Sequence, residues 1–218
     1  MLAQEVSRGV QSLLKHYSNL VIIDVETTGL DPETCNAIEI AALLVRTHRE
    51  GGIRVIKCLD TLVKLPVEKK MPKEIVKLTG ITAKVLKDRG VAQQEAATAL
   101  AHVMHTESAL FVGYNVHFDL LFIKELLKKE GHALPKGLVM LDVLEVFRDR
   151  RGYPCKLGDA ISAYDLVGKV QNAHRAAGDA VACLEVLRAM GRERDDLDIY
   201  VKTFGGGFER SDGQHQSG

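Results

Sequence analysis

Asp24-Val25-Glu26-Thr27-Thr28-Gly29 follows directly after the apolar run Leu20-Val21-Ile22-Ile23. This run is continuous, rich in β-branched residues and too short for a core helix, so it predicts a buried parallel strand. Because side chains alternate along a strand, Asp24 and Glu26 leave it on the same face. Two adjacent carboxylates that lose water need a cation between them, and one or two divalent metal ions would meet that need.

Two further aspartates lie on the apolar faces of segments with helical periodicity. Apolar residues recur at helical spacing after Asp119 in residues 115–127, and after Asp179 in residues 174–190. Both side chains are therefore expected to point toward the core. Isolated inward carboxylates are costly and are usually neutralised or paired. Together the four acids predict a site for hard cations that prefer oxygen ligands, such as Mg²⁺ or Mn²⁺.

The composition is that of an ordinary globular domain. The chain has 218 residues, of which 46% are apolar and 27% charged, and this suits one domain with a sizeable core. Lys plus Arg equals Asp plus Glu at 29 each, and a net charge of zero argues against gripping long duplexes by bulk electrostatics. Nucleic acid is not excluded, because an acidic metal site masks basic residues elsewhere.

Cysteine usage and hydropathy bear on the compartment. The four cysteines have no C-x-x-C spacing, which favours reduced thiols over a zinc knuckle or a disulfide framework. No apolar run approaches the length of a membrane span, and the N-terminus lacks a signal-peptide pattern. We therefore expect a cytoplasmic protein with no membrane partner.

Periodicity and composition divide the chain into three parts. Residues 1–18 are expected to form an amphipathic helix that packs on the core, with a partner surface as the alternative. Residues 19–204 form the main domain, and the glycine-rich residues 205–218 are expected to be a disordered tail. Within the main domain, strands are expected at 19–25, 37–48, 52–64, 110–114 and 138–142, and helices at 72–78, 91–105, 174–190 and near 195–203. This order predicts a mixed α/β sheet.

Three motifs resemble those of the DnaQ-like, DEDDh 3′–5′ exonucleases. They are Asp24-x-Glu26-Thr27-Thr28-Gly29, Asn115-x-x-x-Asp119 and His174-x-x-x-x-Asp179. The resemblance covers roughly residues 19–190, and it implies an α/β, ribonuclease H-like fold with a mixed five-stranded sheet flanked by helices. His174 lies five residues before the last aspartate, as in the histidine branch of the family, whereas the tyrosine branch would place Tyr at position 175. One departure is Tyr114, where family members often carry His.

The resemblance also implies roles for individual residues. Asp24, Glu26, Asp119 and Asp179 are expected to bind two Mg²⁺ or Mn²⁺ ions and, with His174, to form the catalytic set. In this family the matching histidine is the general base, and an imidazole titrates close enough to neutral pH for that task. The candidates for substrate binding are Thr27, Thr28, Gly29, Asn115 and Tyr114. The alternatives are a turn with satisfied hydroxyls at Thr27–Gly29 and a helix N-cap at Asn115.

Several other polar groups have two interpretations each. Glu39 lies in an otherwise apolar strand, where it could contact the metal-binding residues without binding the metal itself, or pair with a buried base. Asp142 ends a strand and is interpreted as structural. The basic segment 148–156 and the group Lys69, Lys70, Lys73 and Lys77 could each contact single-stranded phosphates or simply be solvated surface.

The predicted function is a metal-dependent 3′–5′ exonuclease acting on single-stranded or frayed DNA and releasing nucleoside 5′-monophosphates, in proofreading, repair or end trimming. DNA is favoured because Leu78-Thr79-Gly80-Ile81-Thr82 resembles a stretch of DNA polymerase III proofreading subunits. The alternatives are a 3′–5′ exoribonuclease and a catalytically silent nucleic-acid or polymerase-binding module. The complete acid set argues against the silent module. The expected partners are nucleic acid with a free 3′ end and a polymerase or other nucleic-acid-processing complex.

Overall fold

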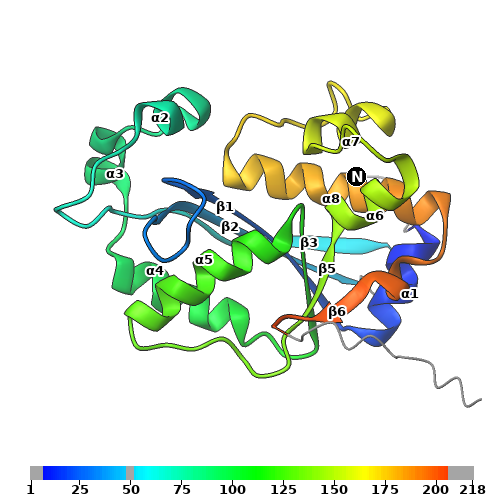
Figure 1. Ribbon diagram of the computed structural model, residues 1–218. Coiled ribbons are helices and arrows are strands. Elements are labelled where there is room, and N and C mark those ends of the chain that lie inside the picture. The colour runs from blue at the N-terminus through cyan, green and yellow to red at the C-terminus, as the bar shows by residue number, and fades with distance from the viewer. Residues whose placement is uncertain (1–6, 48–51, 206–218) are drawn as a thin grey trace, which may run out of the picture.

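The computed structural model describes residues 7–47 and 52–205 of the chain. A six-stranded sheet lies between two layers of helices, with strand order β3-β2-β1-β4-β5-β6 (Figure 1). The strands are β1 Asn19–Thr27, β2 Ala37–Thr47, β3 Ile53–Leu62, β4 Ala109–Gly113, β5 Val139–Asp142 and β6 Val201–Thr203. The helices are α1 Arg8–His16, α2 Lys73–Thr79, α3 Ala83–Arg89, α4 Gln93–Met104, α5 Val116–Lys129, α6 Val143–Arg151, α7 Leu157–Ala163, α8 Ala176–Glu193 and the 3₁₀-helix η1 Leu197–Tyr200.

The sheet is mixed, and β1 lies at its centre. It pairs antiparallel with β2 on one side and parallel with β4 on the other. The β2–β3 hairpin extends the first side, while β5 continues parallel on β4 and β6 closes the far edge antiparallel. The strands expected at 37–48 and 52–64 are thus present as β2 and β3.

Both faces of β1 are buried, as its continuous apolar sequence predicts. Leu20 and Ile22 pack into the core on the side of α8 and α1, whereas Val21 and Ile23 pack into the core on the side of α4 and α5. The alternation continues along the strand, so the side that faces α8 next receives Asp24. The pleat of one strand thus fixes where the acids emerge.

The sheet has one strand more than the five expected. The segment near 195–203, predicted as a helix, is instead the 3₁₀-helix η1 followed by β6, which pairs with β5. A strand of three residues is too short to show a period of two. Helices α3, α6 and α7 were not anticipated either, because each has only seven to nine residues and so few helical turns give no clear pattern.

The ends of the chain are only partly described. The amphipathic helix is present as α1, with Val10, Leu13 and Leu14 buried, and it packs against α8 and η1. Residues 1–6 of the predicted helical segment, residues 48–51 where the strands expected at 37–48 and 52–64 meet, and residues 206–218 of the predicted tail lie outside the described residues. In residues 7–47 and 52–205, no helix combines the length and the apolar character needed to cross a membrane.

Close contact between α1 and α8 depends on two glycines. A Cβ atom on Gly9 would lie 2.8 Å from the Cα of Gly191 and 3.0 Å from the carbonyl oxygen of Arg194. These neighbours are backbone atoms, which cannot move aside as the end of a side chain can. The helices can therefore approach this closely only because both positions lack a side chain.

Gly9→Ala should accordingly lower thermal stability, because the added methyl group forces the two helices apart. Overpacking of a well-packed contact typically costs about 1–3 kcal/mol, which corresponds to a fall in Tm of roughly 2–4 °C per kcal/mol for a chain of this size. Thermal unfolding followed by circular dichroism measures this effect. Gln11→Ala, at an exposed position of the same helix, is the matched control and should leave Tm nearly unchanged.

Candidate active site

Four acidic side chains meet at the end of β1. Asp24 and Glu26 belong to β1 itself, whereas Asp119 lies in the first turn of α5 and Asp179 in the first turn of α8. The backbone N–H of Val25 donates to Oδ1 of Asp119 at 3.2 Å, which ties the start of α5 to the strand between the two strand acids. The structure therefore brings together all four acids that the sequence singled out.

Burial raises the pKa of all four carboxyl groups, and repulsion within the group adds to the effect at Asp24, Glu26 and Asp119. Burial, followed by repulsion from Asp119, Glu26 and Asp179, raises the pKa of Asp24 well above its usual value. Burial, together with repulsion from Asp179 and Glu39, raises the pKa of Glu26 to about 7. For Asp179, burial outweighs the opposing effect of His174 and raises the pKa to about 6.

These acids suit a divalent cation. Oδ1 of Asp179 is buried and has no hydrogen-bond partner among the described residues, so one carboxylate oxygen still lacks compensation. A hard cation would supply that compensation and restore the ordinary acidity of its neighbours. Carboxylate oxygens are the donors that hard divalent cations prefer.

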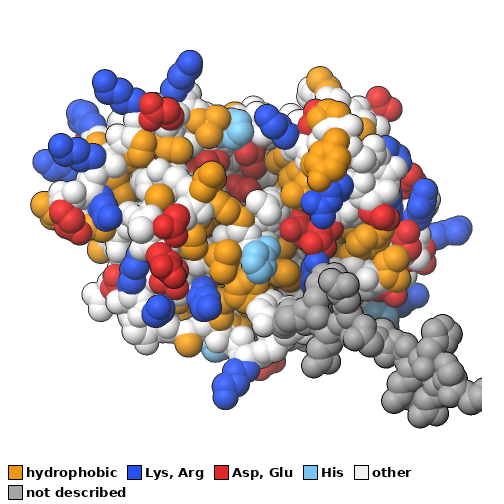
Figure 2. All heavy atoms as spheres, in the orientation of Figure 1, with side chains coloured by type: hydrophobic (Ala, Val, Ile, Leu, Met, Phe, Trp, Pro, Cys, Tyr) orange, Lys and Arg blue, Asp and Glu red, His pale blue; other side chains and the backbone are white. Residues whose placement is uncertain are grey.

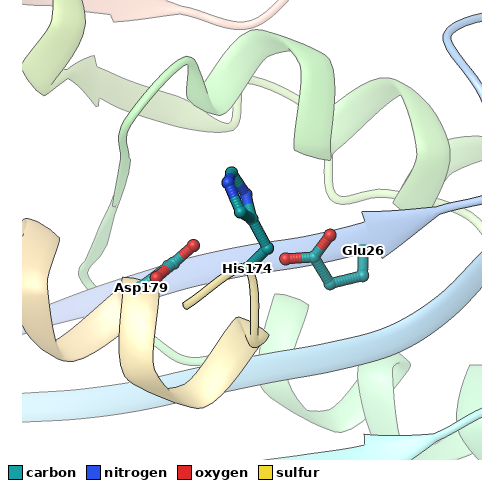
Figure 3. A group of neighbouring side chains, drawn as sticks. All are labelled: Glu26, His174 and Asp179. Atoms are coloured by element: carbon teal, nitrogen blue, oxygen red, sulfur yellow. The ribbon is translucent and has the colours of Figure 1, made fainter. Parts of the chain in front are cut away.

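His174 extends over the acids from the loop that precedes α8. Potential ligand atoms of Glu26, His174 and Asp179 all lie within 4.8 Å of one another (Figure 3). The His174 side chain is exposed, and its backbone has a φ of 50°, a left-handed conformation that a residue other than glycine rarely adopts. The imidazole thus stands between solvent and the acids.

A cleft opens above these residues. Figure 2 shows acidic side chains at the bottom of a hollow between two lobes, which Figure 1 identifies as the α2–α3 lobe and the lobe that contains α7. Besides the acids and His174, the cleft is lined by Val25, Leu78, Tyr114, Phe118, Lys156, Leu157, Gly158, Asp159 and Asn172. Apart from Lys156, the residues of the α7 wall were not predicted from the sequence, because that helix was not anticipated.

The residues predicted to bind substrate have different environments. Only Tyr114 among them lines the cleft, and its hydroxyl donates to the carbonyl of Cys155 at 2.8 Å. The hydroxyl of Thr27 donates to the carbonyl of Gly29, and that of Thr28 accepts from the backbone N–H of Asn36. Both hydroxyls thus make hydrogen bonds inside the turn, as the alternative interpretation expects, and their contact with substrate stays a prediction.

Asn115 and Asp142 are linked through the backbone. Asn115 is exposed with a φ of 72°, and it occupies the N-cap position of α5 without a capping hydrogen bond from its side chain. Its backbone N–H donates to Oδ1 of Asp142 at 2.8 Å, and the same oxygen accepts from the N–H of Leu144 at 3.0 Å. Asp142 therefore has the structural role expected of it.

Glu39 pairs with a base that the sequence did not identify. Its side chain is only 2% exposed, and it accepts three hydrogen bonds from the guanidinium of Arg175, the residue directly after His174. The partner is half exposed rather than buried. The two residues are 136 positions apart in the sequence, so no local pattern could have indicated the pair.

The residues of the two basic segments have different surroundings. In the first, Arg150 and Arg151 form ion pairs with Glu193, and Arg150 also pairs with Asp196, so both contribute to structure. Lys156 of the same segment lines the cleft. Lys70, Lys73 and Lys77 are exposed on and beside α2, and Lys69 donates to the carbonyl of Thr34.

Comparison with known proteins places these motifs in a family. A family model described as exonuclease (RNase_T) matches residues 21–187. The chain is 34% identical over 164 residues to the 3′-5′ exonuclease DinG of Bacillus subtilis, covering 73% of this chain and 16% of that protein. It is 28% identical over 185 residues to a PolC-type DNA polymerase III of Caldanaerobacter subterraneus, covering 82% of this chain and 12% of that one. E. coli exonuclease I in complex with a dA16 oligonucleotide matches with a TM-score of 0.72 at 20% identity, covering 84% of this chain and 42% of that one.

The chain therefore belongs to the DnaQ-like exonuclease family, enzymes that hydrolyse nucleic acid from the 3′ end. The solved structure confirms the expected ribonuclease H-like fold. Enzymes of this family use divalent metals, and Glu26, His174 and Asp179 form a group that could hold an ion. The chain spans less than a fifth of the length of these curated relatives.

The metal-free protein should lose thermal stability as pH rises from about 5 to 8. Glu26, with a pKa of about 7 against an ordinary 4.5, and Asp179, with a pKa of about 6, hold protons in the folded state that the unfolded chain has released. The stability that these protons confer is fully present below the pKa values that the two groups have in the unfolded chain. It is lost as pH rises through their pKa values in the folded protein. Tm measured in chelator across this range should fall, and it should fall less in Glu26→Gln.

Divalent metal should reverse this trend, because binding requires deprotonated carboxylates. The increase in Tm on adding Mg²⁺ or Mn²⁺ should be larger at pH 8 than at pH 5. An equal increase at both values would contradict binding by these acids.

Proposed function

We propose that this chain is a 3′–5′ exonuclease that requires divalent metal, acts on single-stranded or frayed DNA and releases nucleoside 5′-monophosphates. The observation that carries the proposal is the convergence of four acids and His174 at one cleft. Asp24, Glu26, Asp119 and Asp179 would hold two Mg²⁺ or Mn²⁺ ions. When bound, such ions polarise a phosphodiester and stabilise charge on the attacking and leaving oxygens.

The side chains around the ions have separate tasks in this proposal. His174, exposed to solvent and close to Glu26 and Asp179, accepts a proton from the attacking water. Lys156 in the cleft wall offers a positive charge to a substrate phosphate. Tyr114 and Leu78, which also line the cleft, offer surfaces for the sugar or base of the terminal nucleotide, and backbone groups of Thr27–Gly29 and Asn115 are further candidates.

DNA is the favoured substrate for two reasons. The relatives are named as a 3′-5′ exonuclease and a DNA polymerase III, and E. coli exonuclease I is described in complex with a DNA oligonucleotide. The alternative, RNA, would require the site to accept a 2′-hydroxyl. Because the relatives are much longer, we also propose that the chain serves as the exonuclease component of a polymerase or other nucleic-acid-processing complex, in the cytoplasm.

The exonuclease proposal is tested with 5′-labelled single-stranded DNA, a mismatched primer duplex, RNA of the same sequence and a circular single strand. With Mg²⁺ or Mn²⁺, the linear DNA should shorten stepwise from its 3′ end, and the circle should survive because it offers no end. Chelator or Asp24→Asn should abolish cleavage. Asp198→Asn, at an exposed position in η1, is the control and should remain active. Shortening of RNA alone would establish the alternative substrate.

For His174, kcat should rise with pH as the imidazole becomes neutral, because only the neutral ring accepts a proton. His174→Ala should lose roughly 10²- to 10⁴-fold in kcat, the usual contribution of a general base, and it should lose the acidic limb of the pH profile. The concentration of Mg²⁺ needed for half-maximal activity should change little. If His174 were instead a metal ligand, excess Mg²⁺ would restore the activity of the variant.

A further inference from the structure

The residue that follows His174 is anchored to the sheet. The guanidinium of Arg175 is bound to Glu39 of β2. On the other side of His174, the backbone N–H of Ala173 opposes the rise in the pKa of Asp179. His174 itself has a left-handed φ of 50°. Such a conformation in a residue other than glycine persists only where the surroundings determine it.

Both carboxylate oxygens of Glu39 accept hydrogen bonds from the start of α8 and the residue before it. Nε of Arg175 donates to Oε1 and Oε2 of Glu39 at 3.0 Å each, and Nη2 donates to Oε1 at 2.6 Å. The backbone N–H of Ala176, the first residue of α8, donates to Oε2 at 2.9 Å. One buried carboxylate thus binds the side chain after His174 and the first free N–H of the helix, where a negative charge is favourable.

Glu39 is placed beside the catalytic acids without being one of them. It lies directly opposite Glu26 in the antiparallel pairing of β1 and β2. Both of its carboxylate oxygens are occupied by hydrogen bonds from Arg175 and Ala176, and these contacts account for its position.

We propose that Glu39 and Arg175 are positioning residues that fix the His174 backbone and hold its imidazole over Glu26 and Asp179. The inference rests on the proposed role of His174 as general base. The pair acts through His174 and touches neither substrate nor metal. The competing explanation is a structural ion pair that only fastens the start of α8 to the sheet.

A double-mutant comparison separates the two explanations. Glu39→Gln/Arg175→Gln removes both charges together, so that no buried charge is left unpaired. This change is made in the wild type and in His174→Ala, and kcat, KM for a single-stranded DNA oligonucleotide, half-saturating Mg²⁺ and Tm are measured in each. Arg151→Ala, which breaks an ion pair with Glu193 at the opposite end of α8, is the matched control.

If the pair positions His174, the charge-removing change should lower kcat by about 10- to 100-fold in the wild type, the range expected when a catalytic group is displaced by about 1 Å. KM and half-saturating Mg²⁺ should stay close to their wild-type values. In His174→Ala the same change should alter kcat by less than about twofold, because the group that it positions is already gone. Arg151→Ala should leave kcat unchanged.

A second variant covers the case in which the double change does not fold. Arg175→Lys keeps the positive charge but cannot form the paired hydrogen bonds of a guanidinium, and it should reduce kcat in the wild type but not in His174→Ala. An equal loss of kcat in both backgrounds, or no loss in the wild type, would overturn the positioning role.

The outcomes of these experiments distinguish a failure of the proposed function from a failure of this inference. A wild-type chain without exonuclease activity would refute the proposed function. If the wild type is active but His174→Ala retains full kcat, the general-base role and the positioning role both fall while the exonuclease assignment stands.

Discussion

Repulsion among buried carboxylates is the constraint on which the rest of this structure depends. Burial raises the pKa of Asp24, Glu26, Asp119 and Asp179, and repulsion within the group adds to the effect at the first three. Asp119 and Asp179 both lie in the first turn of a helix, where the partial positive charge of the helix end favours an anion. That benefit is small compared with the loss of water, since the pKa of each of these two aspartates stays raised. The fold must therefore hold the acids together by packing, against their mutual repulsion.

The packing of β1 supplies that restraint. The strand is covered by α8 on one face and α5 on the other, and its apolar half belongs to both cores. An acid carried on such a strand cannot move away from its neighbours without disturbing a close-packed interior. His174, by contrast, lies on a loop, and the residue that follows it is bound to Glu39. Groups that must be kept together thus lie on regular elements, whereas the group proposed to exchange a proton lies at the solvent edge.

The sequence predicted those parts of the site that follow from local periodicity. The common face of Asp24 and Glu26 follows from the period of a strand, and the inward direction of Asp119 and Asp179 follows from the period of a helix. The role of His174 rested on resemblance, because a single histidine on a loop has no pattern of its own. The pairing of Glu39 with Arg175 could not be predicted, since it joins residues from two elements far apart in the chain. Likewise, β6 and the cleft wall at α7 were missed because their elements are too short to show a period.

The net charge of zero conceals an uneven distribution that matters for the proposed reaction. The acids gather at the bottom of the cleft, while Lys156 lines its wall and Lys70, Lys73 and Lys77 are exposed on the α2 side. A phosphodiester that approaches the metal-free acids meets charge of its own sign in a partly desolvated site, where electrostatic interactions are stronger than in water. Two divalent cations held by these acids would balance their charge and remove this repulsion at the point where cleavage would occur. On the proposed function, the four acidic charges thus make productive substrate binding depend on prior metal binding. The surrounding lysines attract nucleic acid whether or not metal is present.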